Sequence, residues 1–494
     1  MHRTEGANNL AGLYTAGPPP TTITADALNS IQEEIAGVIE YNGIAVQTAA
    51  TDTRNQLLAA MIKMMPTYDA VVTSQSSWDT LIERTGANAY QFKDDYKSIF
   101  VKVGDYILTL SGGDTWGALL TNVTTHLEFE RGAAISFGAT QGYLNINTNY
   151  ACLKNIHVKG VTSSTVAVNY CFYINATYVI CDSCRASARL SNTTITGFFD
   201  LGGSWLNKYI NCDAYDLNSS GIVRGYYNAK NLSNCNAYDL ECTGAGAAYG
   251  YASCLNINTC MANGIDSENG NSNGFYNCSQ ISGSKVQDID TSGAGTAYGF
   301  NICSNISSSI ATDIQSAVNV DTLGFYACNQ VSGCTASVID ATGTGVAIGF
   351  DTCSQVSGCY AYDIDSDGDA NVIGFDTCSQ VSGCYAYDIA TTGTNALNYA
   401  WGFYTCNQIS SSQAKKIDAN LGPAHGFSYC SMISACYADD IDSAAGAGGG
   451  QGFVGCQYGS SLSTSDNANS LNDYIDTTDA AITNKFSCHP TNWT

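Results

Sequence analysis

Carboxylates recur at one place in a repeated segment of this chain, and carboxylates are the groups that general acid–base chemistry on sugars requires. The residues are Asp216, Asp239, Asp288, Asp313, Asp363, Asp388 and Asp440. Cleavage of a glycosidic bond needs two carboxylates placed across the bond, or a base together with a charge-neutralising cation. Identical acids stacked at a repeat spacing repel one another unless they are exposed, hydrogen-bonded at a bend or bridged by cations. We therefore expect most of this column to occupy bends, where Asp accepts hydrogen bonds from nearby backbone N–H groups.

Chemistry that differs from one repeat to the next requires residues outside the repeated pattern. Four such residues precede the regular repeats, and they are the candidate catalytic groups: Glu128, Glu130, Asp182 and Arg185. Within the repeats, the pair Lys415-Lys416 interrupts the Asp column. These two lysines either pair with acids on adjacent repeats or vary an exposed face.

A short acidic stretch resembles the start of a calcium-binding loop. Asp363, Asp365 and Asp367 alternate along the chain and Gly368 follows them. The acid expected at the twelfth place of such a loop is missing, because Gly374 stands there. We expect a solvated turn here and no metal or other cofactor, with calcium as the alternative.

Tyrosines provide the main recognition signal. In strands, alternate residues point outward, and amphipathic Tyr is favoured at recognition surfaces, where it stacks on sugar rings. The candidate receptor-binding residues are Tyr215, Tyr238, Tyr360, Tyr362, Tyr385, Tyr387, Tyr399 and Trp401. The last two follow Leu397 in a longer repeat, where solenoids place binding loops. The alternative is that the tyrosines line an oligomer seam or a solvated face.

The element that positions these residues is a repeat of about 25 residues. Glycines followed by Phe or Tyr recur from Gly225 to Gly452, and most are followed by Cys four residues after the Gly. Each unit contains short runs rich in Val, Ile, Phe and Thr, split by Gly, Ser, Asn and Asp, which indicate short strands joined by bends. This pattern predicts a parallel β-helix with coils that rise about 4.8 Å each. We expect it to be right-handed from the general rule for parallel crossovers.

Cysteine usage fits the same architecture. The chain has 22 cysteines, and five repeats carry Cys at both the fifth and eleventh places. Ser284, Ser309 and Ser412 replace the second Cys in three others, so disulfides within each repeat would leave orphans. A column that accepts Cys or Ser favours small buried side chains, and we expect reduced thiol ladders. Disulfides in some repeats are the alternative, since cysteine use follows the redox compartment.

The chain divides into four parts by pattern. Residues 1–66 contain an amphipathic stripe at helical spacing, formed by Leu28, Ile31, Ile35 and Val38, which needs partner helices to be buried. This segment is either a cap for the β-helix or a dedicated docking element. Residues 67–160 read as irregular entry coils, 161–460 as regular Cys-rich coils, and 461–494 as a distal cap.

Charge excludes some classes of partner. The net charge is −24, whereas nucleic acid and anionic lipid both require a basic face. No apolar run approaches the length of a membrane span. The start Met1-His2-Arg3 lacks the apolar core of a signal peptide.

The segment from Gly6 to Pro19, followed by Thr24 to Ile35, resembles the N-terminal segments of bacteriophage tail-fibre and tail-spike proteins. Residues 67–160 resemble the entry coils of their pectate-lyase-like β-helices. The resemblance implies a homotrimer, attachment of the N-terminal stripe to a phage tail or baseplate, and recognition of a host-surface glycan. It implies synthesis in the bacterial cytoplasm and location in the virion tail, without membrane insertion.

We therefore expect a structural and adhesive fibre rather than an enzyme. The alternative is a polysaccharide depolymerase, either hydrolase or lyase, on the same scaffold. A cellular surface filament is a second alternative, but it should carry a secretion signal. The repeats favour adhesion because successive coils offer nearly the same side chains, which cannot build one asymmetric catalytic site.

Overall fold

The computed structural model describes residues 68–464, apart from residues 111–113, 115, 138–140, 161–169, 202–205, 317–318, 394, 396, 445–449, 458 and 461. The chain divides into two compact units, 1–69 and 70–494. The predicted attachment stripe of Leu28, Ile31, Ile35 and Val38 lies outside the described residues, as does the predicted cap after residue 464. No helix among the described residues is long and apolar enough to cross a membrane.

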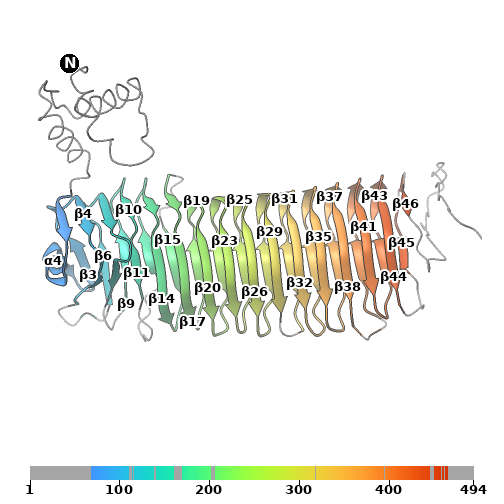
Figure 1. Ribbon diagram of the computed structural model, residues 1–494, viewed down its shortest axis with the longest axis horizontal. Helices are drawn as coiled ribbons and strands as arrows, with labels where there is room; N and C mark the ends of the chain where they lie inside the picture. The colour runs from blue at the N-terminus through green and yellow to red at the C-terminus, as the bar shows by residue number, and fades with distance from the viewer. Residues whose placement is uncertain are drawn as a thin grey trace, which may run out of the picture. The chain divides into compact units, whose positions relative to one another are not determined.

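The second unit is a parallel β-helix, which confirms the predicted all-β fold (Figure 1). Each regular coil contributes one strand to each of three sheets, and each strand pairs with its equivalents one coil before and one coil after. Along the chain a coil runs from sheet B to sheet A and then to sheet C.

Sheet A has 15 strands of three or four residues: β1 (Ala70–Val72), β4 (Ser98–Val101), β7 (His126–Phe129), β10 (Cys152–Lys154), β13 (Ile180–Asp182), β16 (Lys208–Ile210), β19 (Lys230–Ser233), β22 (Leu255–Asn258), β25 (Ser279–Ser282), β28 (Ser304–Ser307), β31 (Asn329–Ser332), β34 (Ser354–Ser357), β37 (Ser379–Ser382), β40 (Asn407–Ser410) and β43 (Ser431–Ser434). Sheet B has 16 strands: β2 (Ile82–Gly86), β3 (Ala89–Phe92), β6 (Trp116–Leu120), β9 (Gln141–Ile146), β12 (Tyr170–Ile174), β15 (Ile195–Asp200), β18 (Val223–Tyr227), β21 (Ala248–Ala252), β24 (Ser272–Tyr276), β27 (Ala297–Asn301), β30 (Thr322–Tyr326), β33 (Ala347–Asp351), β36 (Val372–Asp376), β39 (Ala400–Tyr404), β42 (Ala424–Ser428) and β45 (Gly450–Val454). Sheet C has 15 strands: β5 (Asp105–Ile107), β8 (Ala134–Ser136), β11 (His157–Lys159), β14 (Arg185–Ser191), β17 (Asp213–Ser219), β20 (Asn236–Cys242), β23 (Met261–Ser267), β26 (Lys285–Thr291), β29 (Ile310–Ser316), β32 (Thr335–Ala341), β35 (Tyr360–Ser366), β38 (Tyr385–Thr391), β41 (Gln413–Ala419), β44 (Tyr437–Ser443) and β46 (Ser463–Thr464).

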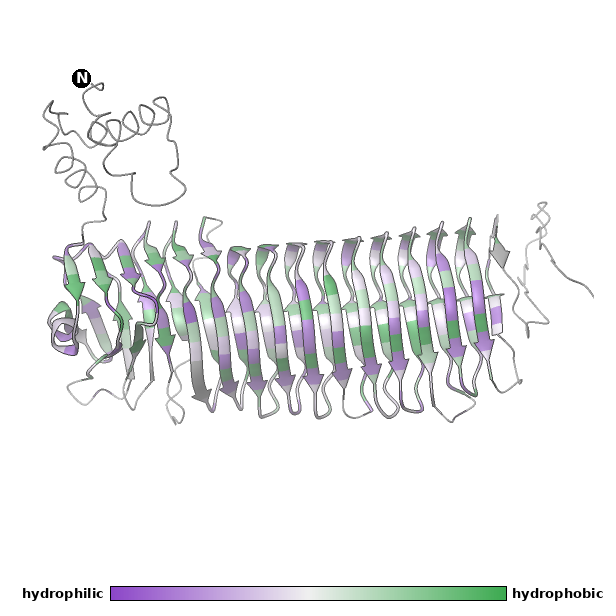
Figure 2. Cartoon of the chain, viewed as in Figure 1, coloured by the Kyte–Doolittle hydropathy of each residue, from purple (hydrophilic) through white to green (hydrophobic). Residues whose placement is uncertain are grey.

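Identical side chains stack in ladders inside the β-helix. The aromatic residue after the repeat glycine forms one ladder in sheet B, in which Phe325 lies 4.6 Å from Phe350 and Phe350 lies 4.8 Å from Phe375, ring centroid to ring centroid. Val356 continues the core in sheet A, and Ala361 and Ile364 continue it in sheet C. Figure 2 shows the result as hydrophobic and hydrophilic bands that run across neighbouring strands.

The bends between and within strands use left-handed backbone at four places in each regular coil. In the coil that contains Asp363, these places are Thr352, Gln355, Gly358 and Asp363, with φ between +52° and +58°. Gly, Asn and Asp tolerate this conformation best, which explains why they punctuate the repeat. β-Branched residues do not favour it, yet Ile302 and Val338 adopt it because the coils on both sides fix their backbone.

The cysteines are free in the structure throughout the described residues, and all but Cys152 are buried. This confirms the predicted thiol ladders. The Cys/Ser interchange at the eleventh place has a geometric cause, because Ser284 Oγ accepts a hydrogen bond from Cys260 N at 3.3 Å, as Cys384 Sγ does from Cys359 N at 3.5 Å. A hydroxyl and a thiol therefore serve the same backbone group on the preceding coil.

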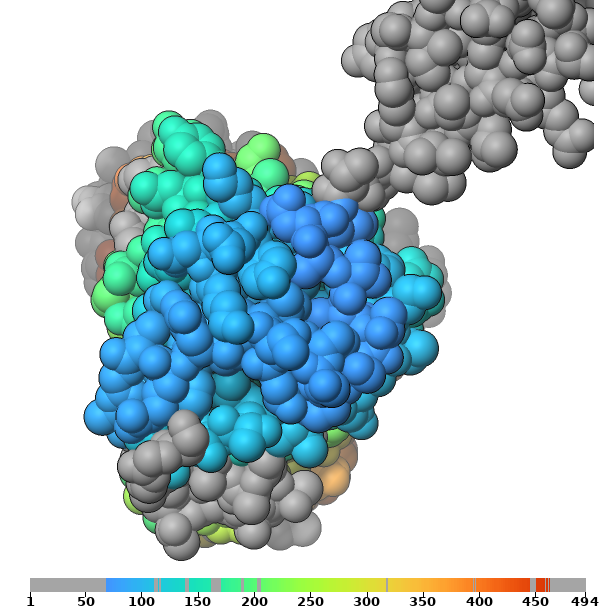
Figure 3. All heavy atoms as spheres, turned by 90° about the vertical axis from the view of Figure 1, so that its left-hand side faces the viewer, coloured from blue at the N-terminus to red at the C-terminus, as the bar shows by residue number. Residues whose placement is uncertain are grey.

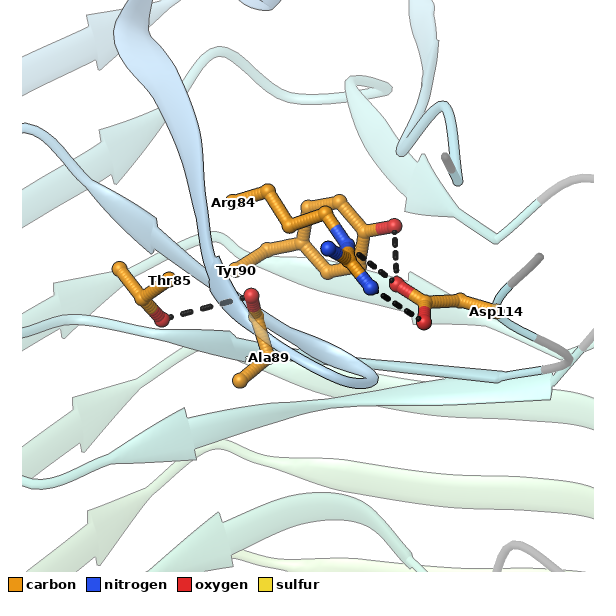
Figure 4. A network of polar contacts seen from close by, with 5 residues as sticks. All are labelled: Arg84, Thr85, Ala89, Tyr90 and Asp114. Atoms are coloured by element: carbon orange, nitrogen blue, oxygen red, sulfur yellow. Dashed lines mark hydrogen bonds and ion pairs between the residues drawn. The ribbon is translucent and has the colours of Figure 1, made fainter. Parts of the chain in front are cut away.

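Helix α4 (Gln75–Leu81) and the hairpin of strands β2 and β3 lie at the N-terminal end of the β-helix, which faces the viewer in Figure 3. Helix α4 begins at the N-cap Ser74 and buries Trp78 and Leu81 against the first coils. Strands β2 and β3 form an antiparallel hairpin there. Arg84 donates to both carboxylate oxygens of Asp114 at 2.9 Å, and Tyr90 Oη donates to Asp114 at 2.7 Å (Figure 4).

Candidate functional site

The predicted tyrosine columns lie on the outer face of sheet C. Tyr360, Tyr362 and Tyr387 are between 42% and 47% exposed, while Tyr385 is half-buried. Tyr360 and Tyr385 stack on each other with centroids 5.0 Å apart, and Tyr215 and Tyr238 do so at 4.9 Å. Stacking covers the ring faces that these pairs share. The columns therefore offer ring edges and hydroxyls more than open faces for sugar stacking.

The Asp column also lies in sheet C, and it occupies the left-handed bend within each strand. The φ angles of Asp216, Asp239 and Asp363 are +52°, +53° and +56°. The expected bend is confirmed, but the expected hydrogen bonds from backbone N–H groups to these carboxylates are not found among the described residues. Two of these carboxylates contact side chains. Gln315 Nε2 donates to Asp313, and Lys416 Nζ lies 2.6 Å from Asp388 Oδ1.

A second column runs beside the first, two residues later in each strand, and it is acidic in most coils, with Asn218, Gln315 and Ala390 as exceptions. Strand register aligns Glu241 with Asp266, and Asp266 with Asp290. Burial, followed by repulsion from Asp290 and Glu241, raises the pKa of Asp266 to about 6. One oxygen of Asp266, Oδ1, is buried without a hydrogen-bond partner.

These acids surround a hollow of about 500 Å³ on the outer face of sheet C. Gly264 is one of the residues that line it, and Gly264 stands where the first column has Asp239 and Asp288 in the neighbouring coils. A β-carbon on Gly264 would lie 3.0 Å from Asp239 Oδ1. The missing side chain opens the hollow, and paired carboxylates line it.

Three of the four predicted catalytic residues lie in two separate sheets, and the fourth, Glu130, lies just outside a strand. Glu128 and Asp182 project from sheet A, where Lys154 stands between them in register, and Lys154 Nζ lies 3.0 Å from Glu128 Oε1. Glu130 follows β7 and accepts from Val103 N at 2.9 Å. Arg185 belongs to β14 in sheet C, in register with Asp213. The structure does not bring these four residues together into one constellation.

The calcium-like stretch spans a strand end. Asp363 and Asp365 belong to β35, and Asp367 follows it. Asp365 accepts from Ser366 N at 2.7 Å, and burial raises the pKa of Asp365. No group of three His, Cys, Asp or Glu side chains in the described part of the chain is arranged to hold a metal ion.

The outer face of sheet B holds an aromatic strip that the repeat pattern had not indicated. Two outward columns, one residue before and two residues after the repeat glycine, contribute its side chains. We call the following side chains the aromatic strip, which includes one arginine: Tyr170, Tyr173, Phe199, Arg224, Tyr227, Tyr249, Tyr276, Tyr298 and Tyr326. Phe199 stacks on Tyr170 at 4.8 Å and on Tyr227 at 5.3 Å.

The strip continues into an apolar cluster separate from the interior core. Leu323, Ile348, Ile373 and Trp401 form this cluster, each between 4% and 7% exposed. Trp401, predicted to lie in a binding loop, is instead part of β39. It is stacked between Tyr399 at 4.7 Å and Tyr404 at 4.4 Å, and its Nε1 donates to His425 Nδ1 at 3.2 Å. Leu397 is the exposed part of this coil, at 70%.

The sequence did contain a signal for the strip. Aromatic residues flank the repeat glycine in many coils, as in Tyr249-Gly250 and Gly274-Phe275-Tyr276. The residue after the glycine is the buried one, so the outward columns must lie beside it. The repeat pattern of Gly followed by Phe or Tyr marks only the buried aromatic residue, so it does not indicate the outward aromatic residues.

No family model and no curated protein matches this chain. A solved structure with a weak likeness is the catalytic unit of a thermostable GH87 α-1,3-glucanase from Streptomyces thermodiastaticus strain HF3-3, with 12% sequence identity and a TM-score of 0.19. The match covers 75% of this chain and 64% of that chain, which is less than two thirds of its length. A likeness this weak identifies neither an activity nor a site.

Proposed function

We propose that this β-helix binds a polysaccharide along the aromatic strip of sheet B. The observation that carries the proposal is the row of half-buried outward tyrosines, which extends over successive coils from Tyr170 to Tyr326. Aromatic side chains with hydroxyl tips combine an apolar surface with hydrogen-bonding groups, as sugar rings do. Asn273 and Asn301 of the same columns are buried and joined by a 2.8 Å hydrogen bond, so the tyrosines are the groups that a polymer can reach.

Binding to a panel of polysaccharides, measured by affinity gel electrophoresis, tests this proposal. Tyr227→Ala and Tyr276→Ala should each weaken binding about tenfold, in the range measured for buried aromatic contacts. Tyr360→Ala is the matched control, because Tyr360 is an exposed tyrosine of sheet C. Binding lost only in Tyr360→Ala would move the site to the sheet C columns, and no binding to any polymer would refute the proposal.

A second function, polysaccharide hydrolysis, is favoured by the hollow at Gly264. Hydrolysis requires a protonated carboxylic acid beside an ionised carboxylate. Asp266, with its raised pKa, lies between Glu241 and Asp290 on neighbouring coils about 4.8 Å apart. In this proposal Asp266 is the acid, and one of its two neighbours acts as base or nucleophile.

Release of new reducing ends from the polysaccharides of the same panel tests hydrolysis. Asp266→Asn should abolish release and leave binding along the aromatic strip unchanged. Asp440→Asn is the control, since Asp440 belongs to the first acidic column far along the chain from the hollow. Equal release from wild-type protein and Asp266→Asn would exclude Asp266 as the acid.

Attachment to a phage tail and trimer formation remain predictions. Both rest on residues 1–66, which lie outside the described residues. Polysaccharide binding would serve a tail adhesin and a depolymerase equally, so the proposal does not depend on either.

A further inference from the structure

Arg224 is the one cation in the outward columns of sheet B between Tyr170 and Tyr326. The described residues of these two columns, one containing Arg224 and the other Tyr227, are otherwise aromatic, aliphatic, hydroxyl or amide side chains. Carboxylates first join this face at Asp351 and Asp376, several coils away. Among the described residues, none of the acids behind the net charge of −24 stands in these two columns near Arg224.

The guanidinium of Arg224 is held by aromatic rings instead of by an acid. Its Cζ lies 4.6 Å from the ring centroid of Tyr227 and 5.9 Å from that of Tyr249. Both distances lie within the range of cation–π attraction. Burial is the largest influence on the pKa of Arg224 and lowers it, and the charged influences come from Tyr227, Tyr249 and Tyr170, without a carboxylate among them.

Arg84 provides a comparison, because its guanidinium is paired with a carboxylate, that of Asp114. It donates two hydrogen bonds to Asp114, and this pairing raises the pKa of Arg84. Arg224 makes no ion pair or side-chain hydrogen bond that the described residues provide. A half-buried guanidinium with five N–H donors and no anionic partner is costly unless solvent or a ligand satisfies it.

A neighbouring polar group is also unsatisfied. Thr196 is in register with Arg224, one coil earlier, and is fully buried. Its hydroxyl has no hydrogen-bond partner. Thr196 and Arg224, on adjacent coils of the same outward column, therefore both carry polar groups without hydrogen-bond partners among the described residues.

We propose that Arg224 binds an anionic substituent of the polysaccharide on the aromatic strip, so that the ligand is an acidic polysaccharide. This inference rests on the proposed binding function and names its ligand class. A carboxylate or a sulfate ester fits the planar donor fork of a guanidinium in two-point contact. Sugar rings on either side of that substituent then contact the ring edges and hydroxyls of Tyr227 and Tyr249, which hold the guanidinium in place.

The long-range charge of the protein does not prevent this contact. The two acidic columns belong to sheet C, a different face of the coil. Charges further apart than about 8 Å are largely screened at physiological salt. The local positive site therefore determines what binds on this face, and affinity should fall as salt increases.

Four polymers test the inference with the full-length protein: polygalacturonate, its carboxyl-reduced neutral form, dextran sulfate and dextran. We expect wild-type protein to bind at least one of the two polyanions about tenfold or more tightly than its neutral counterpart. Arg224→Gln should remove that preference and its salt dependence, and Arg224→Lys should restore it in part. Lys208→Gln removes the same charge from sheet A and should change neither.

The outcomes separate the two proposals. Dependence on Arg224 with polygalacturonate assigns the group as a carboxylate, and with dextran sulfate as a sulfate. Equal binding of polyanion and neutral polymer, or an Arg224→Gln variant that still prefers the polyanion, overturns this inference and leaves strip binding intact. If none of the polymers binds to wild-type protein, both proposals fail. The comparison of polygalacturonate with its reduced form needs no variant and so does not depend on the folding of Arg224→Gln.

Discussion

A β-carbon placed on Gly374 would lie 2.7 Å from the carbonyl oxygen of Gly402, its equivalent one coil later. It would also lie 2.9 Å from the β-carbon of Ala386 in sheet C. The same pair of contacts recurs at Gly324, Gly349 and Gly402. The repeat glycine is thus required by space inside the β-helix, since its backbone angle is not the left-handed one.

Gly374→Ala should therefore destabilise the protein more than a glycine replacement at a bend. Neither of its contacts can move easily, so we expect a cost of about 1–3 kcal/mol in the free energy of unfolding. Gly358→Ala is the matched control, because φ is +58° and no heavy atom lies within 4 Å of its β-carbon. Left-handed backbone alone should cost about 1 kcal/mol there, and less in Gly358→Asn. Denaturant titration measures all three, and equal costs for the two alanine variants would contradict the packing explanation.

How far the sequence could predict this molecule follows from what each residue faces. Interior columns such as Phe350, Val356 and Ile364 repeat in every coil because one geometry constrains them all, so periodicity identified the fold. Outer positions are free to vary: the column of Arg224 contains Tyr249, Asn273 and Leu323 in later coils. Because these outward residues vary, the repeat pattern does not indicate that they form one surface. The strand register shows that they are neighbours and together form the aromatic strip. The hollow was missed for a related reason, since it depends on the absence of one side chain at Gly264.

The thiol ladders predict a large difference between native and unfolded protein. In denaturant without reductant, a thiol reagent should titrate close to all 22 cysteines. In the native state the reaction should be slow, because burial raises the pKa of thiols such as Cys278 and Cys328 and excludes the reagent. Cys152, which is half-buried, should react ahead of the other described cysteines, and Cys152→Ser should remove that phase. A count near zero in denaturant would show that the cysteines are disulfide-bonded.

The second acidic column predicts a loss of stability as the pH rises. The pKa of Asp266 is raised to about 6 by burial, from an unfolded value near 3.9. Between these two pH values the folded state thus binds more protons than the unfolded state. The contribution of Asp266 to the free energy of unfolding is therefore fully present below about pH 4 and is lost as the pH rises through 6. Asp340, whose pKa burial also raises to about 6, should act in the same direction.

Asp266→Asn should flatten this dependence and raise the unfolding midpoint at pH 7.5. The gain should be about 1 kcal/mol, since Asp266 is partly open to solvent, which screens the repulsion. Asp114→Asn is the opposite control: hydrogen bonds from Arg84 lower the pKa of Asp114, so that variant should lose stability at neutral pH and the loss should shrink in acid. The result that would contradict the assignment is a midpoint for Asp266→Asn that follows pH as the wild type does.

Lys416 gives the last prediction, because it replaces an acid in the first column. Its Nζ lies 2.6 Å from Asp388 Oδ1, and Asp440 occupies the same bend one coil later. Lys416→Asp would place three carboxylates on successive coils about 4.8 Å apart and should cost about 1 kcal/mol at low salt. The cost should shrink in 1 M NaCl, where the screening length is about 3 Å.

Lys416→Asn separates charge from backbone conformation. Lys416 has φ of +54°, which Asn tolerates better than Lys, and an exposed ion pair contributes at most about 1 kcal/mol. The two effects oppose each other at low salt, so Lys416→Asn should unfold there at nearly the same denaturant concentration as wild type. In 1 M NaCl the ion pair is screened, and the variant should unfold at a slightly higher denaturant concentration than wild type. If Lys416→Asp and Lys416→Asn instead lost equal stability at low salt, repulsion between stacked carboxylates would not be what this lysine relieves, and its role would reduce to the single contact with Asp388.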